Sequence, residues 1–172
     1  MSKVFYDKPI IDQIFEEFAK NKVKKDKDKL LNLVERLPPE DVNTQSKYDW
    51  TVLIFASWCN YAEIVKLLLE KEGININIQD NCDRTALIYA SWCGQTEVVK
   101  LLLEKENIDV NIQDSNGETV LMRASWCGHT EIVKLLLEKD NIDIHIQTNN
   151  GNTALYYANP EIANLLKNHQ KN

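Results

Sequence analysis

The side chains that could act as nucleophiles, bases or metal ligands gather around one repeated tetrapeptide. Ala-Ser-Trp-Cys occurs three times, beginning at residues 56, 90 and 124. The third copy is followed by a histidine, so that His129 stands two residues after Cys127. A thiol with an adjacent imidazole base is an arrangement used in nucleophilic catalysis. Cys127 and His129 are therefore the candidates for a thiol-dependent enzyme.

The other copies of the motif argue against such chemistry. Tyr61 and Gln95 stand where the third copy has His129. Zinc sites usually draw cysteines from C-x(2–4)-C pairs, which this sequence lacks. Equivalent residues of stacked helical repeats lie ~8–10 Å apart, whereas a disulfide needs Cα atoms within ~7 Å. We expect no metal, no cofactor and reduced thiols at Cys59, Cys93 and Cys127.

The tetrapeptide belongs to a longer repeat with a period of 34 residues. Nearly identical segments begin at Thr51, Thr85 and Thr119, and a truncated copy begins at Thr153. A fainter copy beginning at Leu30 aligns with the first of these segments. A fixed period of this length is typical of repeat proteins.

Each unit is expected to contain two short helices followed by an extended turn. In the middle copy, apolar residues after Thr85 follow helical spacing, and Gly94 is expected to end the first helix. Thr96 is expected to cap the second helix, as is its counterpart Thr130 in the next copy. One such pair cannot bury enough apolar surface alone, so the units are expected to stack as a solenoid.

The repeat resembles the ankyrin repeat. The resemblance is carried by Thr-x-Leu-x-x-Ala, which begins at Thr51, and by Gly-x-Thr-Glu-Val-Val-Lys-Leu-Leu-Leu, which begins at Gly94. It implies an all-α solenoid of helix–turn–helix units joined by extended β-type turns. The units expected are a degenerate N-terminal cap (1–48), three repeats (49–82, 83–116, 117–150) and a truncated C-terminal cap (151–172).

The sequence also departs from the family pattern. The histidine of the family's Thr-Pro-Leu-His is replaced by Ile54, Ile88, Met122 and Tyr156. We therefore expect apolar packing where that histidine usually anchors a polar network. The unit is one residue longer than usual, and the extra residue is expected on the outer surface near Glu72, Glu106 and Asp140.

The first cap is expected to take its inner helix from the segment IIDQIFEEFAK, residues 10–20. The lysine-rich stretch 20–29 is expected to be a solvated connection.

The resemblance implies that a partner protein binds the concave surface formed by the turn tips and the first helices. Residues that differ between the copies on this surface are the candidates, since aromatic residues and arginine dominate binding energy in interfaces. The Trp of each Ser-Trp-Cys motif borders the same surface. The candidate contact residues are Lys47, Tyr48, Trp50, Phe55, Trp58, Asn81, Arg84, Tyr89, Trp92, Ser115, Glu118, Arg123, Trp126 and Asn152.

Alternatives remain for the tryptophans. Trp58, Trp92 and Trp126 form either a stacking ladder between repeats or an exposed aromatic platform that also touches a partner. Trp50 is either a contact residue or packed against the N-terminal cap.

Composition narrows the class of partner. The formal net charge is −6, which argues against a nucleic-acid partner, and no run is long and apolar enough to cross a membrane. We expect a non-catalytic protein-binding module in the cytoplasm, with no membrane partner and no small-molecule substrate. A self-assembling scaffold is the alternative function. A bacterial effector exported without a classical signal peptide would share these sequence features.

Overall fold

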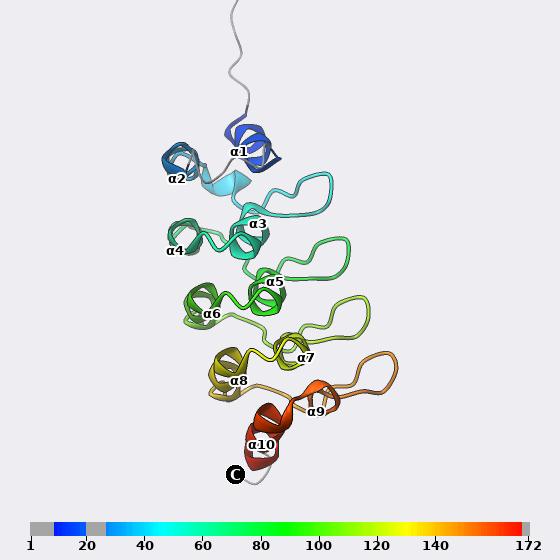
Figure 1. The fold of residues 1–172 in the computed structure, drawn as a ribbon. Helices are drawn as coiled ribbons and strands as arrows, with labels where there is room; N and C mark the ends of the chain where they lie inside the picture. The colour runs from blue at the N-terminus through cyan, green and yellow to red at the C-terminus, as the bar shows by residue number, and fades with distance from the viewer. Residues whose placement is uncertain (1–8, 20–26, 170–172) are drawn as a thin grey trace, which may run out of the picture.

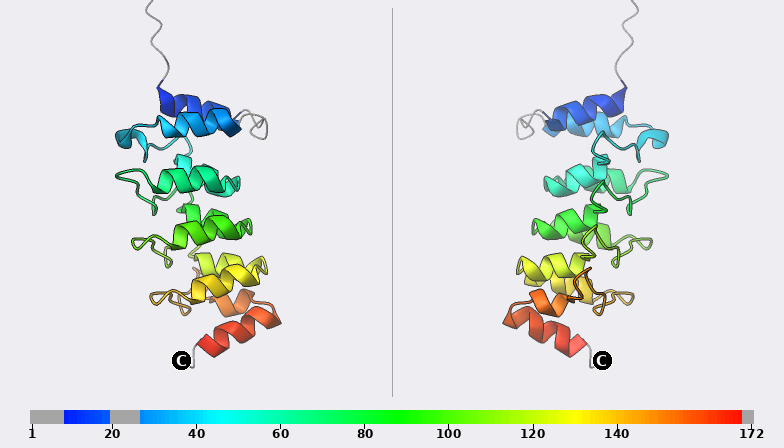
Figure 2. Two further views of the ribbon diagram at one scale, coloured as in Figure 1. Left: turned by 90° about the vertical axis from the view of Figure 1, so that its left-hand side faces the viewer. Right: turned by 90° about the vertical axis from the view of Figure 1, so that its right-hand side faces the viewer.

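The computed structural model describes residues 9–19 and 27–169, which form a single stack of helices with no β-strand in these two ranges. Inner and outer helices alternate along the chain, and each pair lies on the next (Figures 1 and 2). The predicted all-α solenoid is confirmed. The helices are α1 (Ile10–Ala19), α2 (Lys27–Glu35), the 3-10 helix η1 (Pro39–Asp41), α3 (Val52–Trp58), α4 (Ala62–Leu69), α5 (Ala86–Trp92), α6 (Thr96–Leu103), α7 (Val120–Trp126), α8 (Thr130–Leu137), α9 (Ala154–Tyr157) and α10 (Pro160–His169).

Helices α1 and α2 form the N-terminal end of the stack. Helix α1 packs against α2 and α3, so the expected inner helix of the first cap is present. The stretch 20–29 was expected to be a connection, but α2 already begins at Lys27. Residues 20–26 of that stretch lie outside the described part of the chain.

A threonine begins each inner helix of the three full repeats. The hydroxyls of Thr51, Thr85 and Thr119 accept hydrogen bonds of 3.1, 3.3 and 3.4 Å from the backbone N–H three residues later. These bonds satisfy donors that would otherwise lack partners at a helix start. The prediction for Thr96 and Thr130 is wrong. They are the first helical residues of α6 and α8, and the cap positions are Gln95 and His129, whose side chains make no capping hydrogen bond.

The turn between the inner and outer helices needs a left-handed backbone conformation. Its φ is +60° at Asn60, +73° at Gly94 and +73° at Gly128. At Gly94 a side chain is also excluded by space, because an added Cβ would lie 2.7 Å from the imidazole of His129. Glycine at this position therefore serves both the turn and the close approach of the next repeat.

Apolar contacts between successive pairs form one continuous core. Ile54, Ile88 and Met122 are at most 2% exposed, so apolar packing does replace the polar network at this position. Tyr156, their counterpart in the short helix α9, is 71% exposed. The extra residues of each unit lie on the surface as expected, at Glu72, Glu106 and Asp140.

The extended turns project from the stack as fingers, seen on the right of Figure 1. At the base of the fingers, Asn77 donates to the carbonyl of Asn107 (2.8 Å) and accepts from the N–H of Asp109 (3.0 Å). Asn43 and Asn111 make the same pair of bonds to the following repeat. Glutamine side chains also link each finger to the next, at Gln45, Gln79 and Gln113. These side-chain bonds fix the spacing of the fingers without a β-sheet.

Candidate functional site

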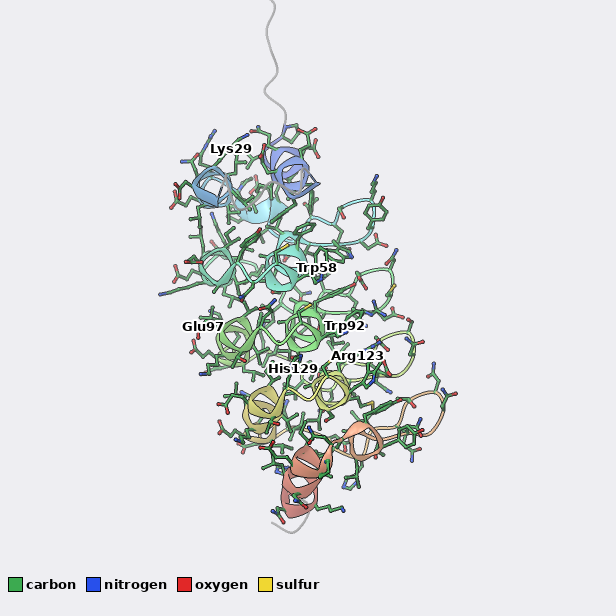
Figure 3. The ribbon with its side chains drawn as sticks, in the orientation of Figure 1. Lys29, Trp58, Trp92, Glu97, Arg123 and His129 are labelled. Carbon is green, nitrogen blue, oxygen red and sulfur yellow. The ribbon has the colours of Figure 1, made fainter. Side chains whose placement is uncertain are left out.

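The candidate contact residues lie along the side of the stack where the inner helices meet the fingers. Trp58, Trp92 and Arg123 are on this side in Figure 3, and Glu97 of the outer helix α6 is on the opposite side. The structure divides the set by exposure. The exposed members are Lys47, Tyr48, Trp58, Asn81, Ser115 and Trp126; the half-buried members are Trp50, Phe55, Arg84, Trp92, Glu118 and Asn152.

The remaining two members, Tyr89 and Arg123, are buried, each 5% exposed. The expectation that they face solvent is wrong, because each is paired with a carboxylate inside the protein. Their side chains are used to hold the repeats together.

Arg123 is the centre of a buried ionic cluster. One guanidinium nitrogen lies 2.7 Å from a carboxylate oxygen of Asp114 and 2.5 Å from one of Glu118. Arg84 approaches the same Asp114 oxygen at 3.6 Å. Two acidic and two basic groups therefore balance in this cluster, and Glu118, also a predicted contact residue, has an internal partner.

Asp114 is held in its charged form by this cluster. Burial alone would raise the pKa of this carboxyl, but the hydrogen bond from Arg123 and those from the N–H groups of Glu118 and Asn116 hold it below its usual value. The two backbone bonds, at 3.0 and 2.9 Å, also close the tip of the third finger. Asp114 therefore links the shape of the finger to the position of Arg123.

The second repeat uses the same device with an uncharged partner. The hydroxyl of Tyr89 donates to Asp80 at 2.6 Å, across the nine-residue separation that also joins Arg123 to Asp114. Burial, followed by this hydrogen bond, raises the pKa of Tyr89 to about 12. In the first repeat the equivalent positions are Ser46 and Phe55. Ser46 has no carboxylate, and Phe55 has no polar group that could bind one. Comparison of these paired positions between the copies would have given a signal for the buried pairs.

The tryptophans do not form the expected ladder. The ring contacts of the described residues do not join Trp58, Trp92 and Trp126 to one another. Instead, the Arg123 guanidinium lies 5.1 Å from the Trp92 ring centroid and 5.7 Å from that of Trp126. Arg84 lies 5.1 Å from Trp92 as well. Cations thus alternate with indoles along this side of the stack, an arrangement favoured by the negative face of an aromatic ring.

The aromatic contacts are denser at the N-terminal end. Trp50 meets Trp58 edge-on with ring centroids 5.3 Å apart, and it also contacts Phe55 and Tyr89. Its ring contacts are therefore with α3 and α5, and not with the first cap as in the second alternative. Phe18 of α1 stacks on Phe55 at 4.0 Å and makes the link to the cap.

Comparison with protein families decides the class of the molecule. A family model described as ankyrin repeats (3 copies) matches residues 22–114, and one described as ankyrin repeats (many copies) matches residues 102–158. The chain belongs to the ankyrin repeat family. Ankyrin repeats are generally protein–protein interaction modules and are typically non-catalytic. A search of curated proteins found no match to this chain.

In this ankyrin stack Cys127 is exposed, and His129 packs against the preceding repeat. Burial raises the pKa of the Cys127 thiol, which opposes formation of the reactive thiolate. The His129 ring nitrogen Nε2 lies 3.2 Å from the Trp92 carbonyl oxygen, and the ring fills the space left by Gly94. The His129 ring therefore contacts the preceding repeat.

The cysteines of the ankyrin units are free thiols. Among the described residues, no cluster of three or more His, Cys, Asp or Glu side chains could hold a metal ion. None of the described helices combines the length and apolar character that crossing a membrane requires.

A cleft that was not expected from the sequence opens between α1 and the first finger. Its volume is about 580 Å³. It is lined by Ile11, Asp12, Phe15, Glu16, Thr44, Gln45, Ser46, Lys47, Tyr48, Trp50 and Phe55. It therefore joins four of the predicted contact residues, Lys47, Tyr48, Trp50 and Phe55, to a helix whose residues were not candidates.

Proposed function

We propose that this ankyrin-repeat chain is a non-catalytic module that binds a partner protein on the side formed by its inner helices and fingers. The observation that carries the proposal is the exposure of Trp58 (45%) and Trp126 (58%) on this side. Tryptophan is enriched among the residues that dominate binding energy in interfaces.

The internal ion pairs support the proposal because they fix an exposed ring in place. Trp126 packs on Arg123, and Arg123 is held by Asp114 and Glu118. A side chain that is ordered before binding loses less conformational entropy when it binds. The same cluster that stabilises the third repeat therefore favours recognition at its surface.

Recovery of partners from cells of the source organism tests this proposal. We compare the native chain with the double variant Trp58→Ala, Trp126→Ala and with a matched control, Glu97→Ala, which changes an exposed residue on the outer side. Loss of a specific partner from the double variant alone supports the proposal, provided that its thermal unfolding still shows a folded stack. Equal recovery of every partner by all three chains refutes the proposed surface.

Self-assembly remains the alternative function. Light scattering across a concentration series tests it, because a self-associating chain increases in mass with concentration. The cytoplasmic location expected from the sequence also remains a proposal, and microscopy of a tagged chain tests it.

A further inference from the structure

The first finger presents main-chain groups that no described residue uses. Ser46 directs its N–H and its C=O into the finger, where they bond to Trp50 and Asp49, each at 2.9 Å. The peptide bonds are trans, so the C=O and the N–H of each peptide unit point in opposite directions. The C=O of Gln45 and the N–H of Lys47 share these two peptide units with Ser46 and therefore point away from the finger. Neither group has a hydrogen-bond partner among the described residues.

The later fingers show what the equivalent groups bind. The carbonyl at the position of Gln45 accepts a hydrogen bond of 2.9 to 3.4 Å from the glutamine side chain of the preceding finger in all three. The N–H at the position of Lys47 donates to a carbonyl of the preceding finger at 3.1 Å from both Ser115 and Asn149. Gln45 and Lys47 both line the cleft between α1 and the first finger. The cleft therefore lies where a preceding finger would pair with the first one.

Beside this main-chain edge the cleft offers apolar surface. Ile11 and Phe15 come from α1, Trp50 from the finger and Phe55 from α3, and Tyr48 is 58% exposed. A volume of about 580 Å³ lies within the range of sites that enclose a ligand group of substantial size. Unpaired main-chain groups along one wall, with a pocket for a side chain beside them, are the two parts by which proteins bind an extended segment.

The fold of the stack limits what can enter the cleft. Each finger is followed directly by an inner helix at the same level (Figure 1). Helix α1 already packs on α3, as α3 packs on α5. A finger of a second copy of this chain would therefore bring its own inner helix onto α1. An extended segment without an attached helix avoids this conflict.

We propose that the cleft binds an extended segment of the partner protein, which pairs its main chain with the first finger and places a large apolar side chain against Phe15 and Trp50. One residue of the segment donates its N–H to the C=O of Gln45 and accepts from the N–H of Lys47, as in a parallel pair of strands. The main-chain bonds contribute affinity, and the apolar side chain contributes specificity. The inference rests on the proposed function, and it names the kind of partner segment that the first unit recognises.

A short apolar peptide and its ester analogues test the main-chain pairing. We titrate the ¹⁵N-labelled full chain with acetyl-Val-Trp-Val-amide and follow the amide resonances by NMR; residues 11–15 and 44–50 should shift. Three analogues each replace one residue's N–H by an ester oxygen, which removes a donor and keeps every side chain. At least one analogue should bind about five-fold more weakly, which corresponds to about 1 kcal/mol for one hydrogen bond. Acetyl-Val-Ala-Val-amide should bind at least about ten-fold more weakly, because it lacks the large apolar side chain.

A proline variant removes the donor on the protein side. Lys47 is the second residue of the turn closed by the hydrogen bond from Asp49 to Ser46, a position that favours proline. Lys47→Pro should bind the peptide about five-fold more weakly than Lys47→Ala, which keeps the N–H. Asn81→Pro makes the same change in the second finger, away from the cleft, and should leave the affinity at its native value. Thermal unfolding of each variant verifies that the stack is intact.

Equal binding of the peptide by Lys47→Pro and Lys47→Ala overturns the inference. So does equal binding of the peptide and all three ester analogues by the native chain, a comparison that decides the matter even if Lys47→Pro does not fold. Shifts confined to residues outside the cleft, or no shift at millimolar peptide, overturn it as well.

The outcome is separable from that of the partner-recovery experiment. If the Trp58/Trp126 variant loses its partner while the ester analogues bind as tightly as the peptide, the cleft inference fails and the proposed function stands. If main-chain pairing is found at the cleft while the partner is recovered equally by all chains, the proposed surface fails.

Discussion

Replacement of Arg123 by leucine tests whether the buried cluster stabilises the stack. Arg123 is 5% exposed, and the substitution removes its contacts with Asp114 and Glu118 while it keeps an apolar side chain between Trp92 and Trp126. The carboxylate of Asp114 then remains buried without its strongest partner. The free energy of unfolding is expected to fall.

The magnitude follows from what Asp114 retains. Removal of one member of a buried ion pair typically costs about 3–5 kcal/mol. Asp114 keeps two backbone hydrogen bonds and the approach of Arg84 at 3.6 Å, so we expect a smaller loss of about 2–3 kcal/mol. Arg123→Tyr should cost less than about 1.5 kcal/mol, because Tyr89 shows that a tyrosine at this position can donate to the corresponding aspartate.

Urea unfolding followed by circular dichroism measures these differences. The matched control is Lys134→Leu, which removes an ion pair in the same repeat whose members, Lys134 and Glu131, are 3.9 Å apart and 49% and 59% exposed. An exposed pair of this kind should contribute less than about 0.5 kcal/mol. If Arg123→Leu costs no more than the control, or Arg123→Tyr costs as much as Arg123→Leu, the stabilising role assigned to the cluster is refuted.

Three further predictions concern hydrogen bonding, pH and thiol reactivity. Asn77→Ala should lower the free energy of unfolding by about 1–2 kcal/mol in urea, because it removes two bonds to the next repeat, whereas His145→Ala, at the equivalent position of the last finger, should have no effect. The pKa of Asp114 is lowered in the folded chain, so its ionised form stabilises the fold. Its contribution to the free energy of unfolding is complete above the ordinary pKa of 3.8 and is lost as the pH falls toward the lower pKa of the folded chain. Asp114→Asn should therefore flatten this part of the pH profile of the urea midpoint. Burial, with a smaller effect of the neighbouring Cys93, raises the pKa of Cys59 from 9.0 to about 11. Mass spectrometry should therefore show that iodoacetamide labels Cys59 about a hundred-fold more slowly than an ordinary thiol. Labelling of Cys127 faster than an ordinary thiol would support the thiol-dependent enzyme instead.

Features that depend on local spacing could be predicted from the sequence. Thr51, Thr85 and Thr119 begin the repeats in the sequence, and in the structure each of them immediately precedes an inner helix and caps it. The left-handed turn at Gly94 is likewise a property of a single residue. Thr96 was assigned wrongly because a threonine before an apolar stripe suits both the cap and the first helical position, and only the path of the preceding turn distinguishes the two.

The contact surface could be predicted only in part. Variation between copies selected positions on the side of the stack formed by the inner helices and the fingers. The tryptophans, which do not vary between the three copies, were included because they border this side, and Trp58 and Trp126 are exposed. The same criterion also selected Tyr89 and Arg123, because a position that varies to suit an internal carboxylate looks like one that varies to suit a partner. The cleft was missed because Phe15 lies outside the regular repeat and reaches the finger only through the packing of α1 on α3.

The sequence by itself determined the period, the helix pairs and the family, because each of these follows from residues within about one turn or one repeat of each other. Tertiary structure alone decided which variable side chains are buried and which are exposed. The fate of Arg123 depends on Asp114, nine residues away, and on Trp92 in the preceding repeat. The environment of a side chain depends on all such neighbours, and the repeat pattern in the sequence does not specify which they are.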